Sequence, residues 1–237
     1  MLKGSVHMRK WIPDITPRYV LFPYQQLDGR FLLIPQEQMK TRFPASWDYL
    51  QSCRDALANR ERGRDQGETW YGYVYPKNFA YMTQPKLLVP SMLQHPEFGF
   101  DDDGSKFFVG SGAGGGGGYG IILPANVSYQ FILGILNSRL IEYIARAAGT
   151  PFQNGWYSCD KGVLEDLPIK MPVIPAERRL AERIESAVDQ IIRDKKKLQS
   201  GSVAGDRDRR DVETAIEENE LRINDDVQKL YNINNLP

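Results

Sequence analysis

The chain has 237 residues, 41% of them hydrophobic, and its 30 basic and 30 acidic side chains cancel to a formal net charge of zero. This length and composition suffice for one large or two small folded domains and exclude a disordered chain. Because the charges balance, a nucleic-acid partner must be met by a local basic patch. No run of 18 apolar residues and no signal-peptide core occurs, so we expect a cytoplasmic protein without membrane contact.

Soft metal ligands are scarce in the sequence. Its only cysteines are Cys53 and Cys159, and its only histidines are His7 and His95. None stands at the spacing of a zinc or iron site, so two free thiols in a reducing compartment are the economical interpretation. The acidic stretch 101–104, in FDDDGSKFF, lacks the alternating ligands and the terminal glutamate of a calcium loop and is interpreted as a turn.

The first third of the chain contains a hairpin signal followed by a helix signal. In RYVLFPYQQLDGRFLLIP, Asp28 and Gly29 separate two apolar runs, which predicts a β-hairpin because a tight primed turn needs positive φ at its central residues. In FPASWDYLQSCRDALANRERG, apolar residues recur at intervals of three and four and predict a helix over about 46–62. We expect Ser46 to cap this helix and Gly63 to end it.

Short runs rich in Tyr, Phe and Val predict further strands: WYGYVYPK, PKLLVP, SKFFVG and YGIIL. The last of them follows the glycine tract of VGSGAGGGGGYGIIL, residues 109–123. A phosphate-binding loop needs a helix after its glycines and usually a lysine with a hydroxyl residue, and neither follows here. The tract is therefore interpreted as a flexible turn between strands.

The segment NVSYQFILGILNSRLIEYIARAAG predicts a helix that packs on the sheet. Asn126 or Ser128 is its expected N-cap, and Gly149 its expected end. Its predicted apolar face consists of Ile132, Leu136, Leu140, Tyr143 and Ala147.

From Glu177 onward the sequence is charged, poor in proline and periodic. Two apolar stripes, joined by GSVAG at 201–205, predict an antiparallel helical hairpin. The stripes consist of Leu180, Ile184, Val188 and Ile191 in the first helix and of Val212, Ile216, Ile223, Val227 and Leu230 in the second, with Asn219 in the gap. With 14 acidic and 12 basic residues in 177–230, the hairpin carries a charge of −2 and the remainder of the chain +2.

These patterns together predict an α+β fold with two domains. The first, residues 1–175, is expected to be a mixed β-sheet domain with packed helices, and the second, residues 176–237, an antiparallel two-helix hairpin. The narrow stripes and the negative charge of the hairpin suit a spacer or docking element, so we expect its removal to leave any nucleic-acid contacts of the first domain in place.

The motifs of residues 1–175 also occur in a recognisable order. They are LKG, RKW, RYVLFPY, LANRERG, WYGYVYPK, QPKLLVP, FDDDGSKFF, YGIILP, ILGILNSRLIEYI and VLEDLPIKMPVIP. In this order they resemble the TaqI-like C-terminal specificity domain, the target recognition part of N6-adenine DNA methyltransferases and type IIG restriction–modification enzymes. The glycine tract stands where that family has a variable connection, which implies a loop without a ligand. Close approach of its bare backbone to DNA phosphates is the alternative.

The resemblance implies that catalysis lies elsewhere. The methyltransferase domain of such enzymes holds a flipped adenine with an Asn/Asp-Pro-Pro-Tyr/Phe tetrapeptide, and none occurs here. Pro13-Asp14 is followed by no acidic-x-Lys at a distance that a PD…(D/E)xK nuclease needs, and we assign it to a turn. We therefore expect no enzyme activity and no cofactor in this chain. Its expected partners are double-stranded DNA and a methyltransferase or nuclease domain or subunit, which would bind S-adenosylmethionine.

Seven residues are candidate DNA contacts: Arg60, Lys77, Lys86, Gln153, Asn154, Trp156 and Lys161. The first three match basic positions of the family; the alternatives are a cation satisfying carbonyls at a helix end and two solvated lysines. The other four lie in GTPFQNGWYSCDKG, 149–162, where amides can pair with adenine and aromatic rings can support bases. The alternative is an ordered loop that covers the core.

Two further interpretations stay open. Arg139 and Arg146 lie seven apart on one helix face near Glu142, which favours an exposed, salt-bridged surface over a DNA contact. For the whole chain, the alternatives to DNA recognition are a protein-interaction scaffold that uses the helical hairpin and a hydrolase with a site assembled from scattered acids. The second lacks any metal or nucleophile constellation.

Overall fold

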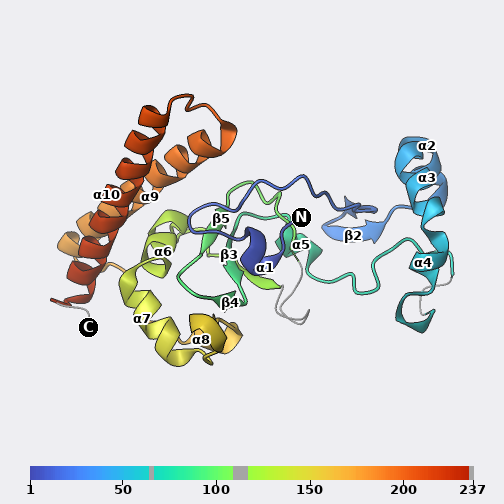
Figure 1. Cartoon of the computed structure of the whole chain (residues 1–237). Coiled ribbons are helices and arrows are strands. Elements are labelled where there is room, and N and C mark those ends of the chain that lie inside the picture. Colours follow the sequence, from blue (N-terminus) through green and yellow to red (C-terminus); the bar gives the residue numbers. More distant parts are fainter. Residues whose placement is uncertain (64–66, 109–116, 235–237) are drawn as a thin grey trace. The chain divides into compact units, whose positions relative to one another are not determined.

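The computed structural model describes residues 1–63, 67–108 and 117–234 (Figure 1). The chain forms two compact units, one made of Met1–Arg18 with Pro85–Pro237 and the other of Tyr19–Gln84. Small antiparallel sheets and many helices, with two long helices last, confirm the predicted α+β class. Residues 109–116 of the glycine tract lie outside the described residues, so the structure does not test the interpretation of the tract as a flexible turn without a phosphate.

The smaller unit begins with the predicted hairpin. Strand β1 (Tyr24–Leu27) pairs with β2 (Arg30–Leu33), and the two turn residues, Asp28 and Gly29, have φ of 48° and 75°. The prediction is confirmed, because both residues adopt the positive φ that a primed turn requires. Helix α5 (Phe79–Met82) packs on β2. Its Phe79 ring belongs to an aromatic cluster that also contains Phe22, Tyr24, Phe31 and Tyr73.

The predicted helix over 46–62 is wrong in its continuity and its start. The segment forms α3 (Pro44–Ser52), α4 (Arg54–Ala58) and the 3₁₀ turn η1 (Arg60–Arg62), preceded by α2 (Gln36–Arg42). The helix begins two residues before Ser46 because Pro44, whose φ suits a first helical turn, occupies that position. Gly63 ends the segment in the left-handed conformation with φ of 82°, as expected.

The stretch WYGYVYPK forms turns, so its prediction as a strand is wrong. Trp70 and Tyr71 are both buried, and they pack with Trp47 at ring-centroid distances of 5.7 and 5.4 Å. Consecutive inward side chains are incompatible with the alternation of a strand. They join the core of the smaller unit, which consists of Ile34, Met39, Trp47, Leu50, Trp70 and Tyr71.

The larger unit contains a three-stranded antiparallel sheet. Strand β3 (Lys86–Pro90) is central, with β5 (Gly99–Asp101) on one side and β6 (Gly118–Ile121) on the other. β3 and β6 confirm the strands predicted from PKLLVP and YGIIL. The N-terminal segment, which includes α1 (Gly4–His7), adds isolated parallel bridges at Leu2–Phe108 and Trp11–Gly99. SKFFVG does not form the predicted strand in its described part, where Phe108 makes only that bridge.

The predicted helix over 126–149 is interrupted at Asn137 and Ser138. It forms α6 (Tyr129–Leu136) and α7 (Arg139–Ala148), capped by the hydroxyls of Ser128 and Ser138. Asn137 Oδ1 accepts a hydrogen bond from Phe98 N–H (3.1 Å) and its Nδ2 donates to Phe98 O (2.8 Å). The interruption rotates the buried face of the second helix. Consequently Ile141 and Ala145 are buried, whereas the predicted Tyr143 and Ala147 are exposed.

The long C-terminal helices confirm the predicted hairpin. Helix α9 (Pro175–Ser200) ends at Gly201, whose φ is 70°, and α10 (Asp206–Tyr231) returns beside it (Figure 1). Ile184, Val188 and Ile191 are completely buried. The hairpin belongs to the larger compact unit because α9 packs against α6, where a Cβ at Gly134 would lie 2.4 Å from Ile184 Cγ2.

The carboxylate of Glu177, at the start of α9, should make the stability of the protein depend on pH. Glu177 accepts hydrogen bonds from the N–H groups of Val173 (2.8 Å) and Ile174 (3.3 Å), and its Oε1 lies 2.9 Å from Lys170 Nζ. The bond from Lys170 and those from the main chain lower the pKa of Glu177 to about 2. Because the folded pKa lies below the ordinary value of 4.5, its contribution to stability is complete above pH 4.5 and is lost as the pH falls toward 2.

We therefore expect Glu177→Gln to lower the free energy of unfolding at pH 7 and to have little effect near pH 2. Urea denaturation of both proteins at several pH values measures this difference. Glu182→Gln, an exposed position of the same helix, is the control. An equal cost of Glu177→Gln at pH 7 and pH 2 would contradict this role for the carboxylate.

Candidate nucleic-acid interface

After helix α7 the chain folds back on itself in a short loop, residues 150–158, which we call the tip loop. Phe152 N–H donates to Trp156 O (2.7 Å), and Ser158 N–H donates to Thr150 O (2.9 Å). The 3₁₀ turn η2 (Gln153–Gly155) forms its end, with φ of 59° at Asn154 and 74° at Gly155. These bonds make the tip loop a closed, hairpin-like excursion.

Gly149 allows the loop to start close to its own return. A Cβ at this position would lie 2.3 Å from Ser158 O. The φ of Gly149 is −74°, so glycine is needed here for close approach and not for a left-handed helix end. The predicted end of the helix is confirmed, but its cause is a tertiary contact.

The tip loop is attached to the rest of its unit through a second small sheet. Its strand β7 (Tyr157–Ser158) pairs with β4 (Met92–Leu93), and Gln94 Nε2 donates to Asn154 O (2.9 Å). Tyr157 and the following Cys159 are buried. Burial raises the pKa of the Cys159 thiol to about 12, which disfavours the reactive thiolate form. The base of the loop is thus fixed in the core.

The end of the loop presents polar and aromatic side chains to solvent. Gln153 and Asn154 are exposed, and their side-chain amides have no hydrogen-bond partner among the described residues. Trp156 is partly buried, which agrees with the alternative that it covers the core. Phe152 is 52% exposed, and the sequence analysis missed it although it directly precedes the two amides. An amide of this kind can bind the N6 and N7 edge of adenine in a major groove.

Lys161 lies just beyond the loop, at the start of α8 (Lys161–Glu165). Asp160 Oδ1 caps this helix by accepting from Val163 N–H (3.2 Å). Lys161 Nζ lies 3.3 Å from Glu165 Oε1, and both side chains are mostly exposed. Such a surface pair is weak, so the lysine is available to exchange its partner for a phosphate.

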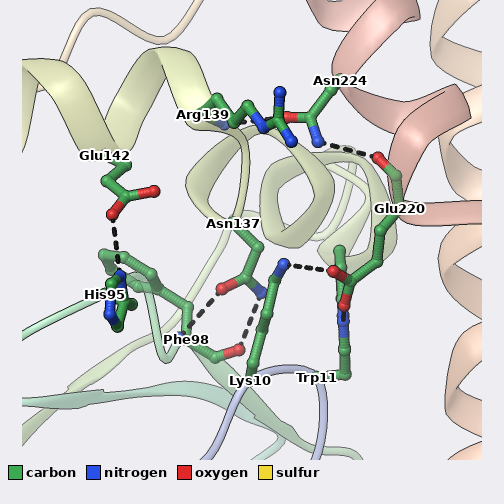
Figure 2. A network of polar contacts seen from close by, with 9 residues as sticks. All are labelled: Lys10, Trp11, His95, Phe98, Asn137, Arg139, Glu142, Glu220 and Asn224. Carbon is green, nitrogen blue, oxygen red and sulfur yellow. Dashed lines mark hydrogen bonds and ion pairs between the residues drawn. The ribbon is translucent and has the colours of Figure 1, made fainter. Parts of the chain in front are cut away.

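A network of polar contacts joins the N-terminal segment, the sheet and the helices of the same unit (Figure 2). Glu220 accepts from Lys10 Nζ (2.8 Å) and Trp11 Nε1 (2.5 Å), and Asn224 Oδ1 accepts from Arg139 N–H (2.8 Å). The network explains two motifs of the resemblance, because RKW supplies Lys10 and Trp11 and LNS supplies the helix break at Asn137. We assign both motifs to structure. The sequence analysis missed Glu220, whose role depends on a contact between opposite ends of the chain.

Two predicted contacts, Arg60 and Lys77, belong to the smaller unit. The Arg60 guanidinium donates to the carbonyl oxygens of Leu57 (2.8 Å), Trp70 (2.9 Å) and Gly72 (2.8 Å). It therefore holds a helix end and the following turns together, as the alternative interpretation proposed. Lys77 is exposed, with its Nζ 5.9 Å from the centroid of the Tyr75 ring.

Lys86 does not present its charge at the surface. Its side chain is 2% exposed and forms an ion pair with the completely buried Asp101 on the adjacent strand. Burial raises the pKa of Asp101, and the hydrogen bond and charge of Lys86 oppose that rise. Asp101, expected in a turn, ends strand β5 instead, and the turn is formed by 102–104. The pair therefore belongs to the interior of the sheet.

Two further kinds of feature are absent from the described part of the chain. No three His, Cys, Asp or Glu side chains there are grouped so that they could hold a metal ion. Nor is any helix in that part both long and apolar enough to cross a membrane.

No family model matches the chain, whereas the known proteins that are similar to it include the following two. The type II restriction enzyme and methyltransferase RM.Eco57I of Escherichia coli is 25% identical over 235 residues, which cover 94% of this chain and 23% of that protein. The second, the type II methyltransferase M.BanIII of Aneurinibacillus aneurinilyticus, is 27% identical over 106 residues, 44% of this chain and 18% of that protein. Both relatives are restriction–modification proteins. The chain therefore spans less than a quarter of either relative.

Proposed function

We propose that this chain is the DNA target recognition region of a type II restriction–modification protein. The observation that carries the proposal is the tip loop, which is fixed at its base and presents the unpartnered amides of Gln153 and Asn154. A rigid support with exposed amides is what direct readout of base edges requires. The alignment with RM.Eco57I over 94% of the chain supports a role in the same kind of system.

The chemistry is proposed to lie outside this chain. Methylation and cleavage are assigned to a methyltransferase or nuclease domain or subunit, which would also bind S-adenosylmethionine. The proposed task of this chain is to hold that part over the chosen sequence on double-stranded DNA. The charged outer faces of α9 and α10 are available to dock the catalytic part.

Recognition of this kind separates phosphate contacts from base contacts. In the proposal Lys77 and Lys161 neutralise phosphates, which contributes affinity without sequence information, while the tip loop reads bases. Each neutralised phosphate adds roughly −0.9 to the slope of log affinity against log salt. A footprint of a few lysines and arginines thus gives a slope on the order of −3 to −5.

The double substitution Gln153→Ala with Asn154→Ala should relax the preference among DNA sequences. Loss of a bidentate amide contact costs about 1–3 kcal/mol of discrimination at one base pair, roughly 5- to 150-fold. Titration of the chain against a random duplex library at two salt concentrations measures both the preference and the salt slope.

Lys77→Glu is the matched control for this experiment. It should weaken binding to every sequence alike and make the salt slope shallower, because a phosphate contact carries no base information. Binding that is insensitive to salt and unchanged by all three substitutions would contradict DNA recognition. Such a result would favour the alternative function, a protein-interaction scaffold that uses the α9–α10 hairpin.

A further inference from the structure

Arg146, on helix α7, connects the tip loop to the segment that follows β4. Its Nη1 donates to Gly155 O (3.3 Å), and its Nη2 donates to Gln94 O. Gln94 in turn donates from its side chain to Asn154 O (2.9 Å). Two successive main-chain carbonyls of the tip loop, those of Asn154 and Gly155, are thus held by side chains from outside the loop.

The charge of Arg146 is already balanced within the protein. Its Nη2 lies 3.4 Å from Glu142 Oε1, and its guanidinium carbon lies 5.0 Å from the centroid of the Tyr157 ring. Contact with the ring and pairing with the carboxylate fix the plane of the guanidinium, so that its forked donors face the carbonyl oxygens of Gly155 and Gln94. An arginine that contacts phosphate would instead direct this fork toward solvent.

The conformation of the loop explains why it needs such a clamp. Asn154 is a non-glycine residue at φ 59°, in the left-handed region that most side chains avoid, and Gly155 beside it is at φ 74°. Because Gly155 has no Cβ, its backbone can adopt many conformations unless contacts select one of them. The bonds from Arg146 and Gln94 act on these two residues.

We infer that Arg146 is a positioning residue, which fixes the amides of Gln153 and Asn154 for base readout and does not itself bind DNA. The inference rests on the proposed function. It differs from the exposed salt-bridged face predicted for Arg139 and Arg146, because only Arg146 reaches the loop.

The test compares Arg146→Ala with Arg139→Ala in the 237-residue chain. Both substitutions remove one positive charge from the same helix, and the Arg139 guanidinium has no hydrogen-bond or ion-pair partner among the described residues. We expect Arg146→Ala to reduce discrimination between duplexes by about 10- to 100-fold, as the loss of the amide contacts would. The salt slope should stay at its wild-type value. Hydrogen exchange of the peptide covering 150–158 should become faster in the absence of DNA.

Arg146→Lys separates the clamp from the charge. Lysine keeps the positive charge but lacks the planar fork, so discrimination should fall and exchange should rise although the net charge is unchanged. This variant also serves if Arg146→Ala does not fold. Arg139→Ala should leave both discrimination and exchange at wild-type values.

The outcomes distinguish this inference from the proposed function. A salt slope that becomes shallower by about 0.9 with discrimination intact would make Arg146 a phosphate contact and overturn the inference. Unchanged exchange in 150–158 would overturn it as well. If the wild-type chain shows no preference among duplexes, the proposed function fails, and the exchange measurement alone then decides whether Arg146 holds the loop.

Discussion

A chain that ends at residue 174 should lose the folded structure of its larger unit. Helix α6 is buried on every side, because the six consecutive residues Phe131–Leu136 are all buried between the sheet, α7 and the α9–α10 hairpin. Removing the hairpin would expose one side of this helix. Exposure of three or four large apolar side chains costs about 5–10 kcal/mol, which is comparable to the whole stability of a domain. This expectation replaces the one drawn from the sequence, in which removal of the hairpin leaves nucleic-acid contacts in place.

Hydrogen exchange resolved along the chain measures the effect and contains its own control. Peptides from α6 and β3 should lose protection in the shortened chain, whereas those around Trp47 and Trp70 should keep it, since the smaller unit has its own core. Persistent protection of α6 would show that the hairpin is only a dock.

A pair of point substitutions probes the same interface in the complete chain. Ile184→Ala removes a completely buried side chain at the α6 contact and should cost about 2–5 kcal/mol. Glu182→Ala, two residues away and exposed, should change stability by less than about 0.5 kcal/mol. Denaturant unfolding of the two variants measures both values.

The features predicted correctly from the sequence are those fixed by neighbouring residues. The turn at Asp28 and Gly29 depends on two adjacent conformational preferences, and the stripes of α9 and α10 depend on spacing along one helix. The window of the tip loop, 149–162, was also identifiable, because a helix end followed by amides and aromatic residues predicts an ordered surface loop.

Several incorrect predictions involve a partner distant in sequence. The helix break at Asn137 depends on Phe98, and the turns at Trp70 depend on packing against Trp47. Lys86, flanked by Pro85, resembled an exposed strand end until Asp101 was located on the neighbouring strand. Tertiary contacts of this kind override local preference, and no periodicity reveals them.

The candidate site likewise contains features that neighbouring residues predict and features that depend on distant contacts. The exposed amides of Gln153 and Asn154, which we propose read bases, were identified from residue type and position, but the contacts of Arg146 that hold the loop were not. Arg146 pairs with Glu142 one turn away, as helix spacing predicts, yet its bonds to Gln94 and Gly155 depend on the fold. A sequence therefore indicates which polar side chains are exposed in a loop more readily than which distant residues position that loop.

The substitution Lys86→Met should destabilise the larger unit by about 3–5 kcal/mol, because it leaves the buried carboxylate of Asp101 without its cation. The effect should depend on pH. Without Lys86 the pKa of Asp101 rises further, so the unfolded chain releases its proton at a lower pH than the folded one. Stability then falls as the pH rises above the ordinary value of 3.8. The cost should thus be larger at pH 7 than at pH 4, as measured by urea unfolding.

Two further variants determine whether the cost arises from the charge pair. Lys86→Met combined with Asp101→Asn removes both charges and keeps an oxygen for the N–H of Lys106, which donates to Asp101 (3.1 Å). Because replacing a whole buried pair is far less costly than breaking it, the double variant should recover much of the lost stability and lose the pH dependence. Lys106→Met, at a more exposed lysine, is the control. If Lys86→Met changes stability by less than about 1 kcal/mol at pH 7, the buried pair is not structural, and Lys86 returns as a candidate phosphate contact.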